Sequence, residues 1–387
     1  MMAMKTKKLA PALLSLLSFS CQSGGDLQPI VIDFSAAKTP APTATPSPLP
    51  KETPAPVPVA TPAPAPRPSP ASAVIGDAPL PVFDPELTNY DYPRPVQVFP
   101  LHSQRQDLKM AYILAEPAEP NGRTVLLLHG KNFSAAYWEP TIRVLLGEGF
   151  RIVAPDQIGF GKSSKPAAYQ FTFHALARNT RNLLDSLKIR KVSVVGHSMG
   201  GMLASRFALM YPETVESLVL VNPIGLEDWK TVVPYKSVDE LYQSELNATP
   251  ESIRAYEKEN YFAGNWKPEY ESLIEILAGW TRHPDYARVA WNAALTTDMV
   301  FTQPVLYEFP LIKAPTLLII GQRDRTAVGK AWAPEQAKRT LGDYPALGRK
   351  AARAIPGARL VEVNDVGHLP QVEAFDAYRK AVLDFLR

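Results

Sequence analysis

The fold is decided by the stretch Lys191-Val-Ser-Val-Val-Gly-His-Ser198-Met-Gly-Gly201 of this 387-residue chain. Its first half is a continuous apolar run, typical of a strand buried on both faces of a parallel sheet. A G-x-S-x-G motif follows directly and opens a segment that is helical in texture as far as Met210. Strand, sharp turn and helix in this order place the Ser198 oxygen at a helix N-terminus, where free amides and the helix dipole favour negative charge. The glycines are needed because larger side chains would collide in so tight a turn. Ser198 is therefore the candidate nucleophile.

The same alternation continues on both sides of this stretch. Strands are expected at residues 96–101, 110–114, 124–130, 151–156, 191–197, 217–222, 315–321 and 358–363, and helices at 137–147, 173–187, 198–210 and 372–386. The first two strands are expected to pair antiparallel. The spacing of the others predicts a doubly wound, mostly parallel sheet with right-handed crossovers.

An insertion interrupts the alternation between about Ile224 and Pro304. It is aromatic and helical in texture, and it follows the sixth expected strand. An insertion of this length after a strand indicates a helical lid over a site at that edge of the sheet.

A serine nucleophile needs a histidine base, and the base needs an orienting acid. Only His283 and His368 follow Ser198. His283 lies in the insertion and precedes a proline, so we assign it to the lid. His368 lies in the loop after the last expected strand, and loops at strand ends assemble the sites of doubly wound sheets. His368 is therefore the candidate base.

Asp324 is the candidate acid because it immediately follows the strand at 315–321, at the same edge of the sheet as Ser198 and His368. Asp228 follows an earlier strand and is the alternative. Asp365 is too close to His368 in sequence and is expected to cap or brace the loop.

The negative oxygen of a tetrahedral intermediate needs hydrogen-bond donors. The backbone amide of Met199 is one expected donor, and the amide of Lys131 is the other, with that of Asn132 as second choice. The side chains of Lys131 and Asn132 either reach the substrate, or Lys131 turns to water while Asn132 supports its loop. His129 is expected to be a structural brace.

Residues from about 95 to 387 resemble the α/β-hydrolase superfamily, and within it the lid-bearing, epoxide-hydrolase-like and haloperoxidase-like branches. The segment Ala154-Pro-Asp-Gln-Ile-Gly-Phe-Gly-Lys-Ser-Ser-Lys-Pro166 is typical of them. The resemblance implies an eight-stranded sheet with the lid after strand 6. Epoxide hydrolases and dehalogenases have an aspartate nucleophile, whereas this chain has Ser198, so the implied chemistry is acyl transfer to water through an acyl-enzyme. No metal and no organic cofactor is implied.

The expected substrate is an ester or lactone of small to medium size with a hydrophobic acyl group. An amide, an N-terminal peptide bond, a carbon–carbon bond of a diketone and perhydrolysis are alternatives that use the same three residues. A ligand-binding protein on a hydrolase scaffold and a purely structural surface lipoprotein are rivals from other classes.

The N-terminus resembles a bacterial lipoprotein signal. Lysines precede the apolar run Leu9–Leu17, which is too short for a finished membrane span, and Cys21, the only cysteine, follows it after a small residue. The resemblance implies cleavage after residue 20, lipidation of Cys21 and, from Gln22, an outer-membrane location in a cell with two membranes. Ser18 and Phe19 depart from the pattern, and an ordinary signal of a secreted or periplasmic protein is the alternative.

Residues 22–94 are expected to form a tether rich in Pro, Ala and Thr. Fifteen of the 39 prolines lie between Pro40 and Pro81. Proline removes amide donors and fixes φ, so this segment is expected to be extended and solvated. The net charge of +3 is too small to indicate a nucleic-acid partner. The expected partners are a small acyl substrate and, through the lipid, a membrane. The sequence is silent on oligomeric state.

Overall fold

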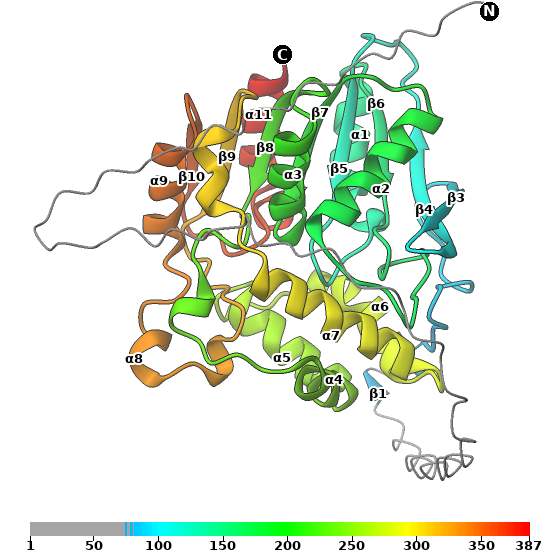
Figure 1. The fold of residues 1–387 in the computed structure, drawn as a ribbon, viewed down its shortest axis with the longest axis vertical. Coiled ribbons are helices and arrows are strands. Elements are labelled where there is room, and N and C mark those ends of the chain that lie inside the picture. The colour runs from blue at the N-terminus through cyan, green and yellow to red at the C-terminus, as the bar shows by residue number, and fades with distance from the viewer. Residues whose placement is uncertain (1–73, 76–77, 80) are drawn as a thin grey trace, which may run out of the picture. The chain divides into compact units, whose positions relative to one another are not determined.

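An eight-stranded sheet forms the centre of the computed structural model, which describes residues 74–75, 78–79 and 81–387 (Figure 1). The strand order is β10-β9-β8-β7-β5-β6-β4-β3. Only β4 runs against its neighbours, pairing antiparallel with β3 and β6. The strands are β3 (Val96–Ser103), β4 (Gln106–Ala115), β5 (Thr124–Leu128), β6 (Arg151–Pro155), β7 (Val192–His197), β8 (Val215–Val221), β9 (Thr316–Gly321) and β10 (Arg359–Val363). The predicted fold class and its mostly parallel sheet are confirmed. Two further short strands, β1 (Val74–Ile75) and β2 (Ala78–Pro79), pair with each other.

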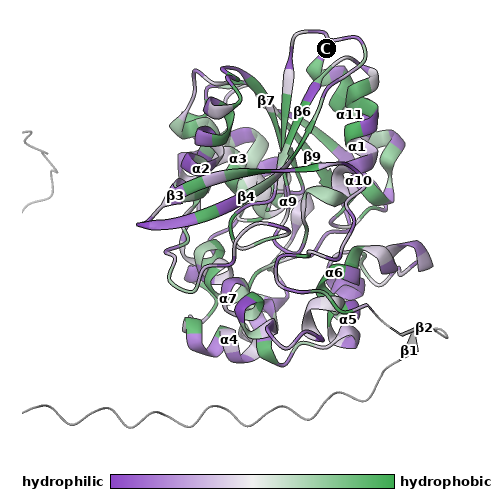
Figure 2. Cartoon of the chain, turned by 90° about the vertical axis from the view of Figure 1, so that its right-hand side faces the viewer, coloured by the Kyte–Doolittle hydropathy of each residue, from purple (hydrophilic) through white to green (hydrophobic). Residues whose placement is uncertain are grey.

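Helices cover both faces of the sheet. One apolar core joins the sheet to α2 (Phe173–Ser186), α3 (Met199–Met210) and α9 (Tyr344–Ala354). A second core, on the other face, joins it to α1 (Glu139–Gly147) and α11 (Phe375–Leu386). The central strands β5, β7 and β9 are buried at every position because they are covered from both sides. In Figure 2 the central strands are coloured mainly as hydrophobic, whereas the helices carry both hydrophobic and hydrophilic residues.

The insertion, residues 224–304, lies between β8 and β9 and is mainly helical. Its long helices are α4 (Val238–Leu246), α5 (Pro250–Asn260), α6 (Glu271–Thr281) and α7 (Tyr286–Thr302), with the short 3₁₀ turns η2 (Trp229–Thr231) and η3 (Pro268–Tyr270). Capping boxes at Ser237 and Thr249 begin α4 and α5 by satisfying free amides of the first turn. Figures 1 and 2 show α4 to α7 gathered at one end of the sheet.

The remaining helical elements are short. They are η1 (Ala135–Trp138), η4 (Leu306–Leu311), η5 (Lys330–Trp332), α8 (Glu335–Lys338) and α10 (Pro370–Glu373). The single helix expected at 372–386 is in fact two, α10 and α11, because Ala374 leaves the helical conformation with φ −139°. The break separates α11 from the short helix α10, which begins two residues after His368.

The folded part of the chain begins before residue 95. Residues 81–94 fall within the segment that composition assigns to the tether, yet Phe83 and Leu87 are buried against Trp280 and other residues of the insertion. Trp280 Nε1 donates to the carbonyl of Asp84 at 2.9 Å. Prolines are sparser here, and the burial of two large apolar side chains against the insertion stabilises the segment.

The predicted signal at 1–20, Cys21 and the tether as far as residue 73 lie outside the described residues. Within the part of the chain that the structure describes, no helix combines the length and the hydrophobicity needed to cross a membrane.

Candidate active site

Ser198 occupies the sharp turn between β7 and α3. Its φ of 56° and ψ of −122° lie outside the regions that residues other than glycine usually adopt. Such a conformation costs on the order of 1–3 kcal/mol and persists only where its surroundings enforce it. The Ser198 carbonyl accepts from the amides of Gly201 and Ile224, and its own amide donates to Val221, so the turn is held on both sides. Ser198 is 4% exposed.

Asp324 and His368 are in direct contact, although 44 residues separate them. His368 Nδ1 lies 2.6 Å from Asp324 Oδ2, and both side chains are fully buried. His368 Nε2 is also buried and has no hydrogen-bond partner among the described residues. The imidazole can therefore donate through Nδ1 to the carboxylate, which leaves Nε2 as the basic nitrogen.

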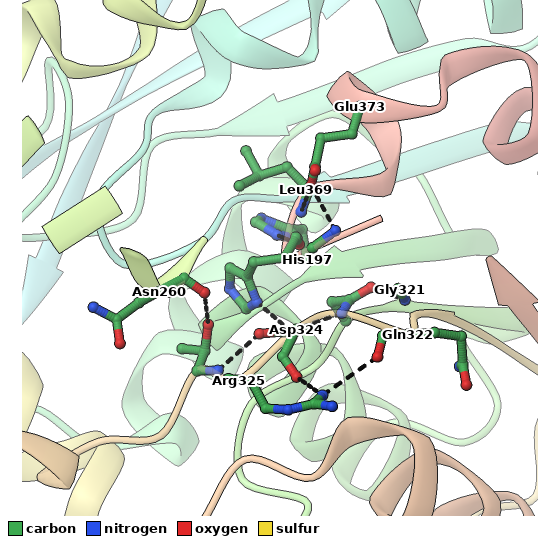
Figure 3. Close-up of polar contacts among 12 residues, drawn as sticks. His197, Asn260, Gly321, Gln322, Asp324, Arg325, Leu369 and Glu373 are labelled. Carbon is green, nitrogen blue, oxygen red and sulfur yellow. Dashed lines mark hydrogen bonds and ion pairs between the residues drawn. The ribbon is translucent and has the colours of Figure 1, made fainter. Parts of the chain in front are cut away.

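Three donors fix the Asp324 carboxylate. Oδ2 accepts from Asn222 Nδ2 at 2.7 Å in addition to His368, and Oδ1 accepts from the amide of Thr326 at 2.8 Å. Asn222 directly follows β8, and its Oδ1 accepts from the amide of Gly321 at the end of β9. Figure 3 shows Asp324 between Gly321 and Arg325 at the centre of these contacts. Hydrogen bonds of this kind compensate the cost of burying the carboxylate.

His197 fixes the backbone of His368. Its Nε2 lies 2.9 Å from the His368 carbonyl, and its Nδ1 lies 3.0 Å from the hydroxyl of Tyr137. Nε2 therefore donates to the carbonyl and Nδ1 accepts from Tyr137. Burial, together with the neighbouring His368, holds the pKa of His197 well below its usual value. His197 is therefore a neutral link between the turn of Ser198 and the loop of His368.

The carboxylate that braces the His368 loop is Glu373, and not Asp365. Glu373 Oε1 accepts from the amides of Gly367 and Leu369, on either side of His368, at 3.0 and 3.3 Å (Figure 3). Burial raises the pKa of Glu373 to about 7. Asp365 is exposed and has a positive φ of 58°. The expectation that Asp365 braces the loop is therefore not supported, and the hydrogen bonds to the loop amides come from Glu373.

The loop after β5 passes directly beside Ser198. A Cβ added at Gly130 would lie 3.1 Å from the Ser198 Cβ, and one at Gly200 would lie 2.1 Å from the carbonyl oxygen of Leu128. Only glycine permits this approach of α3 to the end of β5. The two expected oxyanion donors, the amides of Lys131 and Met199, therefore belong to segments in contact.

The side chains of Lys131 and Asn132 both turn toward the insertion. Lys131 Nζ pairs with Glu245 of α4 at 3.3 Å, and Asn132 Nδ2 donates to the hydroxyl of Tyr261 at 2.9 Å. Of the two interpretations left open by the sequence, support of the loop by Asn132 agrees with this contact, whereas Lys131 does not turn freely to water. The loop is tied to the insertion at two points.

Three other residues that the sequence analysis considered, His129, Asp228 and His283, make hydrogen bonds elsewhere and none to His368. His129 Nε2 accepts from the amide of Gln157 and its Nδ1 donates to Gly130, so His129 is a neutral brace, with its pKa lowered by burial. Asp228 caps η2 by accepting from the amide of Lys230. His283 accepts from the amide of Asp285 at the start of α7.

Glu257 of α5 is fully buried, and neither of its carboxyl oxygens has a hydrogen-bond partner among the described residues. Burial raises its pKa from 4.5 to about 8. Between these pH values the folded chain keeps a proton that the unfolded chain releases, so stability falls as pH rises. At pH 7 the cost is about 3 kcal/mol, from 1.4 kcal/mol for each unit between 4.5 and 7.

Glu257→Gln is therefore expected to stabilise the protein at pH 7 to 8 and to change little well below pH 4.5, where the wild-type carboxyl is neutral in both states. Urea denaturation of both proteins across this pH range measures the difference. Glu259→Gln, at an exposed position of the same helix, is the control. An equal effect of Glu257→Gln at all pH values would contradict the ionisation argument.

Comparison with known proteins places these residues in context. A family model described as "alpha/beta hydrolase fold" matches residues 123–241. A solved structure of a probable hydrolytic enzyme from Pseudomonas aeruginosa PAO1 is 52% identical, covers 79% of this chain and 99% of its own, and superimposes with a TM-score of 0.78. A 2-hydroxy-6-oxo-6-phenylhexa-2,4-dienoate hydrolase of Burkholderia cepacia is 31% identical over 280 residues, 68% of this chain and 88% of the relative. Lipase 1 of Psychrobacter immobilis is 27% identical over 274 residues, 69% of this chain and 77% of the relative.

Proposed function

The chain belongs to the α/β-hydrolase fold family and is a hydrolase, and on that premise we propose that it is a serine hydrolase that cleaves an ester or related acyl bond. Ser198 is the nucleophile, His368 the base and Asp324 the acid. The observation that carries the proposal is the buried pair of His368 and Asp324, with Nε2 of the imidazole free to accept a proton.

The mechanism follows from these positions. His368 Nε2 takes the proton of Ser198 as the serine oxygen attacks the acyl carbon. Asp324 keeps the proton of the imidazole on Nδ1 and stabilises the positive charge that the ring gains. The amides of Met199 and Lys131 donate to the oxyanion. His368 then protonates the leaving group and activates a water molecule, which releases the acid from Ser198.

The insertion serves as a lid in this proposal. Ser198 and His368 are almost completely shielded from solvent, and the insertion contacts the His368 loop through the carbonyl of Tyr261. A covered site of this kind excludes water and strengthens the electrostatic interactions within it. Aromatic side chains nearby, among them Phe133 and Tyr137, favour a small or medium hydrophobic acyl group.

Hydrolysis of p-nitrophenyl esters by the full chain, from acetate to long acyl chains, tests the proposal. Turnover is expected, with a preferred chain length that reports the size of the covered site. A fluorophosphonate probe is expected to label Ser198 and abolish this turnover. Absence of both labelling and turnover in a folded protein would exclude a serine hydrolase.

Carbon–carbon bond hydrolysis is the second candidate, because the relative from Burkholderia cepacia is named for the cleavage of a dienoate. The same serine, histidine and aspartate serve this chemistry. Labelling of Ser198 without turnover of any ester, followed by turnover of a vinylogous diketone, would favour it.

We also propose that Cys21 carries a lipid that anchors the hydrolase to a membrane outside the cytoplasm. The support is the apolar run and the small residue that precede the cysteine. Metabolic labelling with an alkynyl fatty acid is expected to mark the wild-type protein and not a Cys21→Ala variant. Unlabelled wild-type protein recovered from the soluble exported fraction would support the ordinary secretion signal instead.

A further inference from the structure

Tyr261 lies where the insertion meets the candidate active site. Its ring stacks on the imidazole of His368, with centroids 4.7 Å apart and planes inclined by 29°. Its carbonyl accepts from the amide of His368 at 2.7 Å, and its hydroxyl accepts from Asn132 at 2.9 Å. One residue of the insertion thus contacts both the base and the loop that carries an expected oxyanion donor.

Two more hydrogen bonds fix the same part of the insertion to the loop of Asp324. We name residues 260–264 the docking turn. Thr326 Oγ1 donates to the carbonyl of Asn260 at 3.2 Å, and Arg323 Nη2 donates to that of Ala263 at 2.8 Å. Figure 3 shows the carbonyl of Asn260 directed at the loop that carries Asp324. The acid loop and the base loop are therefore held by one turn of the insertion.

The fit between the docking turn and the His368 loop is close. A Cβ added at Gly367 would lie 2.1 Å from the Tyr261 carbonyl oxygen, so only glycine leaves room for the hydrogen bond to the next residue. Ala263 has a positive φ of 49°, a conformation that surrounding contacts must enforce. The close fit at Gly367 and the enforced backbone of Ala263 indicate that the docking turn is held in a defined position against the His368 loop.

We propose that Tyr261 is a positioning residue for His368, so that the insertion supplies part of the catalytic framework in addition to covering it. The inference rests on the proposed function. The bond to Asp324 holds one edge of the imidazole but leaves the ring free to tilt, since rotation about the last bond of histidine is soft. A stacked aromatic ring restricts that tilt and so fixes the direction in which Nε2 points.

Tyr261→Leu removes the ring and is expected to lower kcat by about 10 to 100-fold, because small misplacements of a reacting group cost rate steeply. KM is expected to change less than about 3-fold, since transition-state geometry and not binding is affected. The acid limb of the pH profile of kcat/KM is expected to move. Tyr261→Phe keeps the ring and is expected to restore most of kcat. Tyr261→Met fills the space with a flexible chain and is the second variant if the leucine protein does not fold.

Tyr270→Leu is the matched control, because Tyr270 belongs to the same aromatic cluster but stacks on Phe262, at 3.9 Å. Equal losses of kcat in Tyr270→Leu and Tyr261→Leu, or a loss in Tyr261→Leu that appears only in KM, would overturn the proposal.

A second measurement does not depend on turnover. The proton between His368 Nδ1 and Asp324 is expected to give a low-field NMR signal in the wild type and in Tyr261→Phe, and a broadened or shifted one in Tyr261→Leu and Tyr261→Met. An unchanged signal in the leucine and methionine variants would reject positioning. If the wild type shows the signal but hydrolyses no acyl substrate, the proposed function is wrong. The NMR signals of the Tyr261 variants then still show whether Tyr261 positions His368.

Discussion

Replacing Ser198 with alanine is expected to lower kcat for the preferred p-nitrophenyl ester by about 10⁶-fold, the order of the loss when a serine nucleophile is removed. Alanine lacks the oxygen that forms the acyl-enzyme, so only binding and oxyanion stabilisation remain to assist attack by water. The turn at φ 56° is no more strained for alanine than for serine, and the fold is expected to persist.

Ser205→Ala is the matched control for this measurement. Ser205 is a buried serine of α3 whose hydroxyl donates to the carbonyl of Gly201, one turn beyond the nucleophile. It should retain turnover and labelling by the fluorophosphonate. Wild-type rates in the Ser198→Ala protein would remove Ser198 from the mechanism.

Replacing Asp324 with asparagine is expected to lower kcat by about 10³ to 10⁴-fold. The carboxylate accepts a hydrogen bond from Nδ1–H of His368, whereas an amide presenting its NH₂ group would donate to Nδ1 and move the imidazole proton to Nε2. Nε2 could then no longer accept the proton of Ser198. Steady-state kinetics on the same ester measures the loss.

Asp228→Asn separates the two acids that the sequence left as alternatives. Asp228 caps η2 and accepts from the hydroxyl of Tyr307 at 2.9 Å, and the structure gives it no contact with His368. It is expected to change kcat less than about 3-fold. A large loss in Asp228→Asn together with a small one in Asp324→Asn would reverse the assignment of the acid.

The fold could be predicted because its signals are local. Continuous apolar runs such as Val192–His197, with helical segments between them, predict a parallel sheet wherever they occur. Local sequence patterns did not predict the structure where the burial of a residue depends on partners far away in the sequence. Phe83 and Leu87 lie in the segment that composition assigns to the tether, and they are buried mainly against residues of the distant insertion, such as Trp280 and Tyr286. The break at Ala374 likewise coincides with no proline or glycine at that position that would have marked it in the sequence.

The candidate catalytic residues could also be predicted from the sequence, whereas the residues that support them could not. Ser198, Asp324 and His368 each follow a strand, and the ends of parallel strands meet at one edge of a sheet. The structure brings Asp324 and His368 into contact, as the order of residues predicts, while their catalytic roles remain for the kinetic tests. The residues that support them gave no such signal. Asn222 and Glu373 are ordinary polar residues in sequence, and Tyr261 is one aromatic residue among many in the insertion.

The sequence by itself determined the eight strands of the sheet, the helices α1, α2 and α3, the turn that carries Ser198 and the strand ends from which its partners come, but not helix α9. These follow from periodicity, glycine sterics and the polarity of short segments, all of which act within a few residues. The tertiary structure alone decided that Asn222 supports Asp324, that Glu373 replaces Asp365 as the brace, and that Tyr261 stacks on His368. Each of these last contacts joins different loops of the chain. They depend on how the folded sheet and the docked insertion set loop positions, which no local propensity encodes.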